Sequence, residues 1–212
     1  MRALLLTCAF GLGLLSMASP ADAAGVQLIV RHQVADYAAW RKVYNSFAAT
    51  QKKLGVKAQS VYQSTDDPHD ITVLHSFATL DEAKAFTASD ELKSAMQNAG
   101  VTGMPQIWIT REAPDSSGKP GKVRLFVQQV VASYADWRKA YLDFQPNAKK
   151  MGTTSQAVYW SVANANDVIV FHDYATVEKA KAFAGSAELK SAMQSAGVKG
   201  MPQMWFTRRA LK

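Results

Sequence analysis

Apolar and polar residues alternate along the chain with two periods, one typical of strands and one typical of helices. In residues 26–34, Leu28 and Val30 alternate with polar neighbours, which predicts a strand. Asp36 then stands where a helix cap is expected, and apolar residues recur at helical spacing until Gly55. The sequence therefore predicts a strand followed by an amphipathic helix.

Residues 58–111 are predicted to form three more strands and a second helical stretch. Residues 58–63 and 71–77 are predicted as two strands around a polar turn. Thr79 and Glu82 fit a capping box that opens a second helical stretch, and residues 105–111 form the last strand. The predicted unit is β-α-β-β-α-β.

This unit occurs twice. Shifted by 97 residues, the sequence matches itself without a gap, and residues 92–108 match residues 189–205 at 14 of 17 positions. We expect repeat 1 at residues 24–111, a Pro-, Gly- and Ser-rich linker at residues 112–122, and repeat 2 at residues 123–212. In repeat 2 the first helix contains Pro146, which predicts a kink or a break there.

Both faces of each predicted sheet carry large apolar groups. In the last strand, Ile107 and Ile109 lie on one face and Trp108 on the other. Two helices cover only one face, and a large apolar face is rarely left in water. We therefore expect an α+β protein in which the two repeats pack sheet to sheet as an intramolecular pseudo-dimer with a shared interior.

The first 23 residues have the layout of a secretory signal peptide. Met1-Arg2 is followed by an apolar run that is too short to span a bilayer, and then by small residues ending in Ala21-Asp22-Ala23. We expect cleavage after Ala23 and a periplasmic or secreted product that is not embedded in the membrane. The only cysteine, Cys8, falls in this leader, so we expect no disulfide and no thiolate metal site in the mature chain.

The chain is basic, with 24 Lys and Arg against 17 Asp and Glu and a net charge of +7. The charges are scattered, which favours a solvated surface; the alternative is attraction to an anionic polymer or an acidic ligand. The sequence shows no nucleic-acid-binding module, and we expect no nucleic-acid partner.

Two histidines are the first candidates for chemistry. His75 and His172 occupy equivalent positions on the third strand of each repeat. If they face the shared interior, they could bind a ligand, act as acid and base, or ligate a metal. The alternative is a buried, hydrogen-bonded histidine. A metal would need further ligands that neither repeat supplies at suitable spacing, so no metal site is predicted.

Aromatic residues and one arginine are the remaining candidates. Trp108 and Trp205 could form an interior wall that stacks a flat ligand, or could simply pack the two repeats together. Arg31 could offer its charge to an anionic ligand. Tyr62 and Tyr159 could donate a hydrogen bond to a quinone-like or phenolic oxygen, or could only pack.

Three short patterns carry a resemblance to a known superfamily. They are Asp36-x-x-x-Trp40 at the first helix, Asp70 leading into Phe77-x-x-x-Asp81-x-Ala83, and Ser89-x-Glu-Leu-Lys93. With these the chain resembles the dimeric α+β barrel superfamily and its antibiotic-biosynthesis-monooxygenase-like domains. The resemblance implies two ferredoxin-like βαββαβ domains packed as a barrel, with ligands held between sheet and helices or inside the barrel. The superfamily includes monooxygenases, haem-degrading and haem peroxidase-like enzymes, and isomerases. The Asn/Trp/His set of its haem-degrading branch is not found at matching positions here.

Three functions stay open from the sequence. The first is an exported protein that binds a small, flat, partly apolar molecule between its two sheets, acting as a cofactor-independent monooxygenase if it is an enzyme. The second is a non-catalytic periplasmic protein with a solidly packed interior. The third is haem binding through a histidine; otherwise no cofactor is predicted. Further self-association of the chain is left open.

Overall fold

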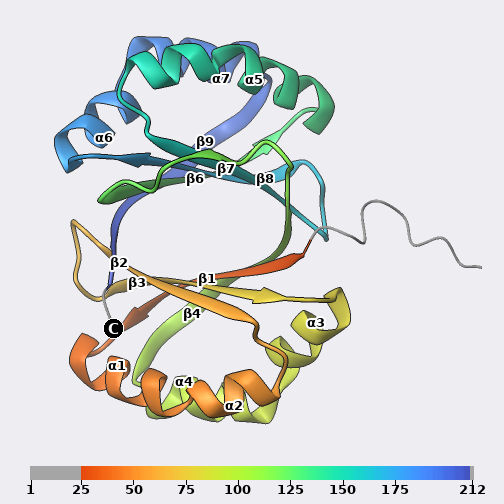
Figure 1. The fold of residues 1–212 in the computed structure, drawn as a ribbon, viewed down its shortest axis with the longest axis vertical. Coiled ribbons are helices and arrows are strands. Elements are labelled where there is room, and N and C mark those ends of the chain that lie inside the picture. Colours follow the sequence, from red (N-terminus) through yellow and green to blue (C-terminus); the bar gives the residue numbers. More distant parts are fainter. Residues whose placement is uncertain (1–24, 211–212) are drawn as a thin grey trace, which may run out of the picture.

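The computed structural model describes residues 25–210 (Figure 1). The predicted signal peptide, its expected cleavage after Ala23, and Cys8 lie outside the described residues. Within the described part, no helix combines the length and apolar character that crossing a bilayer would need.

Each half contains a four-stranded antiparallel sheet with its helices on one face. The N-terminal half runs β1 (Val26–Val34), α1 (Tyr37–Ser46), α2 (Ala48–Lys53), β2 (Ala58–Ser64), β3 (Asp70–Phe77), α3 (Leu80–Ala88), α4 (Asp90–Asn98) and β4 (Val101–Glu112). The C-terminal half runs β6 (Val123–Val131), α5 (Tyr134–Lys150), β7 (Ser155–Ser161), β8 (Asp167–Tyr174), α6 (Val177–Ala184), α7 (Ala187–Ser195) and β9 (Val198–Arg209). Within the predicted linker, β5 (Ser117–Gly118) pairs with β7.

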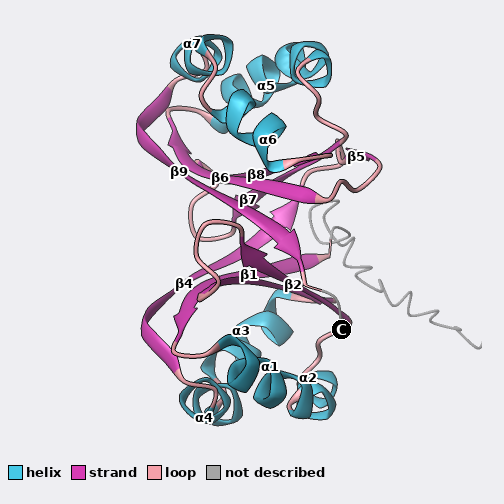
Figure 2. Ribbon diagram, turned by 90° about the vertical axis from the view of Figure 1, so that its left-hand side faces the viewer, coloured by secondary structure: helices cyan, strands magenta, loops and turns pink. Residues whose placement is uncertain are grey.

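The two sheets face each other and the helices lie on the outside (Figures 1 and 2). The strand order is β4-β1-β3-β2-β9-β6-β8-β7-β5, and an additional β4–β7 pairing closes the sheet on itself. The closure comes from the long last strand of each half, which crosses to the other half: Thr110 pairs with Ser161, and Arg209 with Tyr62. The expected sheet-to-sheet α+β barrel is confirmed.

Helix starts follow the caps expected from the sequence. The Asp36 carboxylate accepts a hydrogen bond from the Ala39 backbone N–H at 2.6 Å. Thr79 and Glu82 form a reciprocal capping box at the start of α3. Each cap satisfies backbone N–H groups that have no partner within the helix.

Of the kink or break predicted at Pro146, the break does not occur. Helix α5 runs unbroken through Pro146, and its buried residues Trp137 and Ala148 hold it against the sheet on both sides of the proline. In the N-terminal half the equivalent stretch is instead divided into α1 and α2 at Phe47. Contacts with the sheet therefore outweigh the one backbone hydrogen bond that a proline cannot make.

The last strands begin earlier than predicted because each contains a bulge. In β4 the register against β1 shifts between Arg31 and Gln33, so residues 103–105 are left unpaired opposite this point. Gly103 has φ +68°, a conformation that favours glycine. The bulge projects Met104 into solvent with 92% of its surface exposed, and it is how Pro105 fits inside a paired strand.

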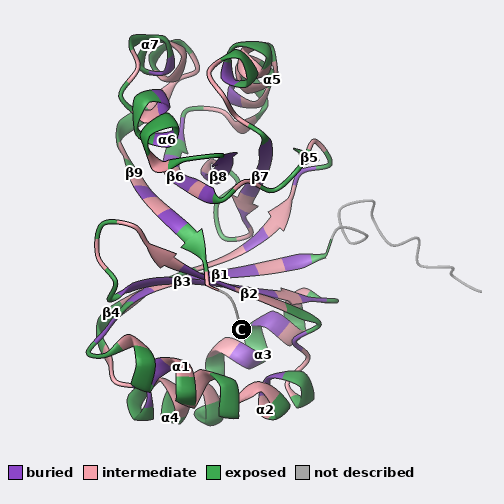
Figure 3. Ribbon diagram, turned by 60° about the vertical axis from the view of Figure 1, so that its left-hand side comes forward, coloured by how far each residue is buried: buried purple, intermediate pink, exposed green. Residues whose placement is uncertain are grey.

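Figure 3 shows many buried residues along the strands. Their side chains form clusters on both sides of each sheet. The barrel interior holds one cluster that includes Ile29, Leu74, Phe126 and Trp205. The spaces between sheets and helices hold the other clusters. The molecule therefore has two kinds of interior space, the barrel interior and the helix–sheet layers.

Candidate functional site

Aromatic side chains fill the middle of the barrel. Trp108 and Trp205 lie in the interior, as their strand positions predict, and their rings stack with centroids 6.3 Å apart. Phe126 also stacks with Trp205, with ring centroids 5.1 Å apart. Tyr62 and Tyr159 are buried in the same cluster. The predicted aromatic wall is therefore present in the interior. Its rings are in contact with one another.

Two arginines in the barrel are neutralised by carboxylates. Arg31 donates to Asp70 with Nη2–Oδ2 at 2.6 Å, and its guanidinium lies 4.6 Å from the Trp205 ring centroid. Arg124 donates to Asp173 at 2.7 Å, and its guanidinium lies 3.5 Å from the Phe171 ring centroid. The charge proposed for an anionic ligand at Arg31 is thus already paired.

The Arg124–Asp173 pair was not found from the sequence. The residues that match Arg124 and Asp173 in repeat 1 are Gln27 and Ser76, so comparison of the repeats gave no signal. Only the β6–β8 register, which places Arg124 opposite Asp173, reveals the pair.

His75 and His172 do not face the barrel interior. Each is paired with a leucine whose side chain points to the helices, His75 with Leu28 and His172 with Leu125. The two histidines therefore do not share the interior with Trp108 and Trp205, because a sheet separates them. Both faces of the third strand are apolar, and the sequence pattern alone did not say which one is inner.

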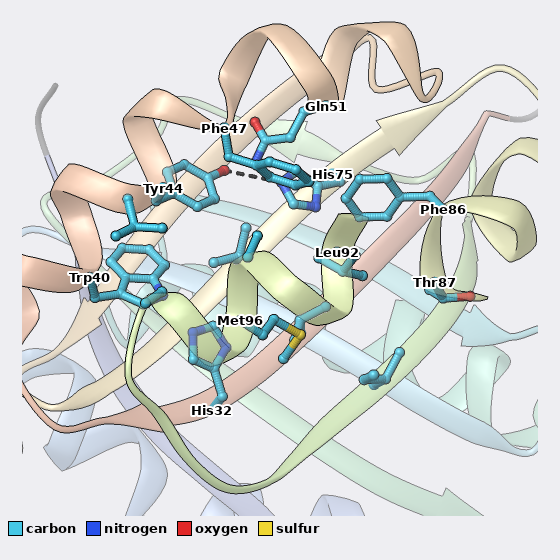
Figure 4. A pocket seen from close by; sticks show the side chains of 16 residues that line it. His32, Trp40, Tyr44, Phe47, Gln51, His75, Phe86, Thr87, Leu92 and Met96 are labelled. Carbon is cyan, nitrogen blue, oxygen red and sulfur yellow. Dashed lines mark hydrogen bonds between the residues drawn. The ribbon is translucent and has the colours of Figure 1, made fainter. Parts of the chain in front are cut away.

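His75 instead borders a cavity of about 50 Å³ between the N-terminal sheet and its helices. We call it the His75 cavity; Figure 4 shows His75 on one side of it and His32 on the other. The lining comes from β1, β3, β4 and all four N-terminal helices. It consists of Val30, His32, Trp40, Val43, Tyr44, Phe47, Gln51, Val73, His75, Phe86, Thr87, Leu92, Ala95, Met96, Ala99 and Ile107.

His75 is held by Tyr44. The two rings are nearly parallel, with centroids 6.1 Å apart, and Tyr44 Oη lies 3.0 Å from His75 Nε2. The Tyr44 hydroxyl donates to Gln59 Oε1 at 2.6 Å. We therefore assign the proton to His75 Nε2, which donates to the Tyr44 oxygen. This leaves His75 Nδ1 as a hydrogen-bond acceptor.

Several buried polar atoms around this cavity have no hydrogen-bond partner among the described residues. They are His75 Nδ1, both ring nitrogens of His32, and Gln51 Oε1. His32, Gln51 and His75 are 7%, 2% and 4% exposed. Leaving such a group unpaired costs about 1–3 kcal/mol, and native proteins contain few of them. Their concentration around this cavity makes it a candidate site.

The electrostatic character of the cavity is neutral at pH 7. Burial lowers the pKa of His75 to about 4, and it lowers the pKa of His32 to about 4 against a smaller opposing effect of Asp70. Burial also raises the pKa of Tyr44. Both histidines and the tyrosine are therefore uncharged under ordinary conditions.

A second cavity lies at the equivalent place in the C-terminal half. This His172 cavity has a volume of about 40 Å³ and lies between the sheet and helices α5, α6 and α7. Its lining includes Gln129, Trp137, Tyr141 and His172. Gln129 replaces His32, so the two cavities are not chemically equal.

Haem does not fit the His75 cavity as it stands. His75 Nε2, one of the two ring nitrogens that could ligate an iron, is engaged by Tyr44. The volume of about 50 Å³ is far below the roughly 300–1,000 Å³ of pockets that enclose larger ligands. Among residues 25–210, no group of three or more His, Cys, Asp or Glu side chains is placed to hold a metal ion.

The fold has clear counterparts among solved structures. No family model and no curated protein matches the sequence. An anthrone oxidase-like protein is 11% identical, with a TM-score of 0.65 over 89% of this chain and 92% of its own. A proposed monooxygenase from Lactobacillus acidophilus is 12% identical, with a TM-score of 0.57 over 88% and 94%. A haem-binding protein from Thermus thermophilus is 12% identical, with a TM-score of 0.56 over 88% and 91%.

These likenesses confirm the dimeric α+β barrel fold suggested by the sequence patterns. At 11–12% identity they concern the fold alone.

Proposed function

We propose that the protein binds a small, uncharged, largely apolar molecule in the His75 cavity. The observation that carries the proposal is the set of unpaired polar atoms of His32, Gln51 and His75 around an otherwise apolar lining. A ligand that donates hydrogen bonds to His75 Nδ1 and Gln51 Oε1 would pair two of these four atoms and remove their share of the cost. The apolar walls would hold the rest of the molecule.

The lack of charge in the lining supports an uncharged ligand. None of the 16 residues that line the cavity is Lys, Arg, Asp or Glu, and the pKa of about 4 keeps His32 and His75 neutral at pH 7. A charged ligand would lose its hydration without gaining a counter-charge.

Entry of a ligand requires the cavity to widen, and α4 is the element best suited to move. Leu92 and Met96 of α4 line the cavity, yet α4 contains no fully buried residue. Helix α3, in contrast, buries Ala83 and Phe86. Elements with few buried apolar contacts open at the lowest free energy.

Binding suits this geometry better than acid–base catalysis. A histidine with a pKa near 4 is a weak base at pH 7, because effective catalytic groups have pKa values near the working pH. Cofactor-independent oxygenation would rely on an activated substrate in the same cavity. Oxygen uptake in the presence of the bound molecule distinguishes an oxygenase from a carrier.

The alternative is a non-catalytic protein whose packed interior serves only stability. The aromatic filling around Trp205 in the barrel favours it for that space. The unpaired atoms under the N-terminal helices favour a ligand there. The proposed ligand therefore lies between sheet and helices, and not between the two sheets as the sequence suggested.

Native mass spectrometry of protein isolated from its natural source tests the proposal. We expect an adduct that is lost on Ala95→Met, because the longer side chain fills the His75 cavity. Ala192→Met changes the equivalent position in the His172 cavity and is the matched control. It should retain the adduct. An adduct-free wild-type protein, or an adduct that persists in Ala95→Met, would contradict the proposal.

We also propose that the protein is exported. The support is the sequence layout of residues 1–23, with small residues before Ala24. The intact mass of protein from the periplasm or the medium should correspond to a chain beginning at Ala24. Recovery of the unprocessed chain from the cytoplasm alone would refute export.

A further inference from the structure

The His172 cavity differs from the His75 cavity in how its tyrosine is used. Tyr141, Gln156 and His172 stand at the positions of Tyr44, Gln59 and His75 in repeat 1. The Tyr44 and His75 rings are 8° from parallel and hydrogen-bonded, whereas the Tyr141 and His172 rings are inclined by 48°. As a result the Tyr141 hydroxyl is buried and has no partner among the described residues.

Two further atoms beside Tyr141 are unpaired within the same part of the chain. His172 Nδ1 and Gln129 Oε1 have no hydrogen-bond partner, and these residues are 5% and 4% exposed. Both residues line the cavity together with Tyr141. Burial raises the pKa of Tyr141, so its hydroxyl stays protonated and can donate.

The available hydrogen-bond donors differ between the two cavities. At the His75 cavity the Tyr44 hydroxyl already donates its proton to Gln59, so Tyr44 has no proton left to donate to a ligand. The unpaired oxygen of Gln51 provides an additional acceptor there. Repeat 2 has Ala148 in place of Gln51, and it keeps the tyrosine donor. A duplicated fold thus presents different hydrogen-bonding groups at its two equivalent positions.

We propose that the His172 cavity is a second, non-equivalent binding site for a small neutral molecule with a carbonyl oxygen, which accepts from the Tyr141 hydroxyl. The cavity walls are otherwise apolar and include Phe144, Phe183 and Leu189. The ligand class is therefore a compact apolar ketone or similar carbonyl compound. This inference stands on repeat 2 alone and does not require the His75 cavity to be occupied.

The test uses cyclohexanone as the probe. This ring compound accepts hydrogen bonds but cannot donate one. Trp137 lines the His172 cavity and Trp40 the His75 cavity, so their indole N–H signals in NMR report the two sites separately. We expect cyclohexanone to shift the Trp137 signal in a saturable manner.

Tyr141→Phe is the deciding variant. It removes only a hydroxyl that has no partner in the described structure, so the fold should be retained. We expect a loss of cyclohexanone affinity at Trp137 of roughly threefold to tenfold, the value of one hydrogen bond. Tyr44→Phe is the matched control and should leave cyclohexanone binding at Trp137 unchanged.

Two results would overturn the inference. The first is the absence of a saturable Trp137 shift, which would indicate that water alone occupies the cavity. The second is equal cyclohexanone affinity in Tyr141→Phe and wild type. Failure of the His75 proposal would instead be seen as a missing adduct in native mass spectrometry, with the Trp137 result intact.

Discussion

Buried histidines make the stability of this protein sensitive to acid. Burial lowers the pKa of His32, His75 and His172 to about 4, whereas an unfolded chain has histidines near pKa 6.5. Below pH 6.5 the unfolded state binds more protons, so stability is present above that pH and is lost as the pH falls toward 4. The free energy of unfolding should decrease by about 2 kcal/mol per histidine between pH 7 and pH 5.

Urea unfolding of wild type and His75→Leu at the two pH values checks this. The variant should lose about a third of the pH dependence. His69→Gln is the control, because His69 has an exposed side chain, and it should behave like wild type. An unfolding free energy that is equal at pH 7 and pH 5 would show that the histidines are not buried as described.

The indole of Trp205 depends on one hydrogen bond across the barrel. Trp205 Nε1 donates to Thr72 Oγ1 at 2.9 Å, and both residues are buried. Thr72→Val should lower the free energy of unfolding by about 1–3 kcal/mol, because it leaves the indole N–H unpaired. Thr72→Ser keeps the hydroxyl and should lose less. Equal stability of the Val and Ser variants in urea unfolding would contradict this role.

The sequence predicted the position of a side chain correctly where the alternation along its strand decides which face of the sheet it lies on. Trp108 and Trp205 were expected inside and are found there. For His75 and His172 the period gave two apolar faces, and only the register with Leu28 and Leu125 shows which one meets the helices. Partners in space, such as Tyr44 for His75, could not be obtained from spacing along the chain.

Helix α4 should be the most mobile wall of the His75 cavity. It has no fully buried residue, whereas its counterpart α7 buries Leu189. In hydrogen–deuterium exchange, amides of α4 should exchange faster than those of α7 and of α3, because the opening of weakly packed elements costs less free energy. Ligand binding in the His75 cavity should slow α4 selectively. Faster exchange in α7 than in α4 would contradict this.

The sequence predicted elements well where local chemistry decides them. The caps at Asp36 and Thr79 act within four residues, and both are observed. The effect of Pro146 and the early start of β4 depend on tertiary contacts and on a bulge around Gly103. Local rules cannot include either of these.

At the scale of the whole molecule, apolar patterning on both sheet faces was enough to predict a barrel formed within one chain. It was not enough to predict how the barrel closes. Closure depends on β4 and β9 extending beyond their own sheets to pair with β7 and β2. Those registers depend on the relative placement of the two halves, which becomes defined only after they pack.

The crossed strands predict that the halves stay together without a covalent connection. A protease site inserted between Lys119 and Pro120 lies in an exposed segment. After cleavage, the β4–β7 and β2–β9 pairings and the aromatic interior should hold the fragments as a 1:1 complex in size-exclusion chromatography. Trp205→Ala should promote dissociation of the cleaved form, because truncating a buried aromatic residue costs about 3–5 kcal/mol, whereas the uncleaved variant keeps its halves covalently linked. If cleaved wild-type halves elute separately or tumble independently in NMR relaxation, the shared interior does not hold the molecule together.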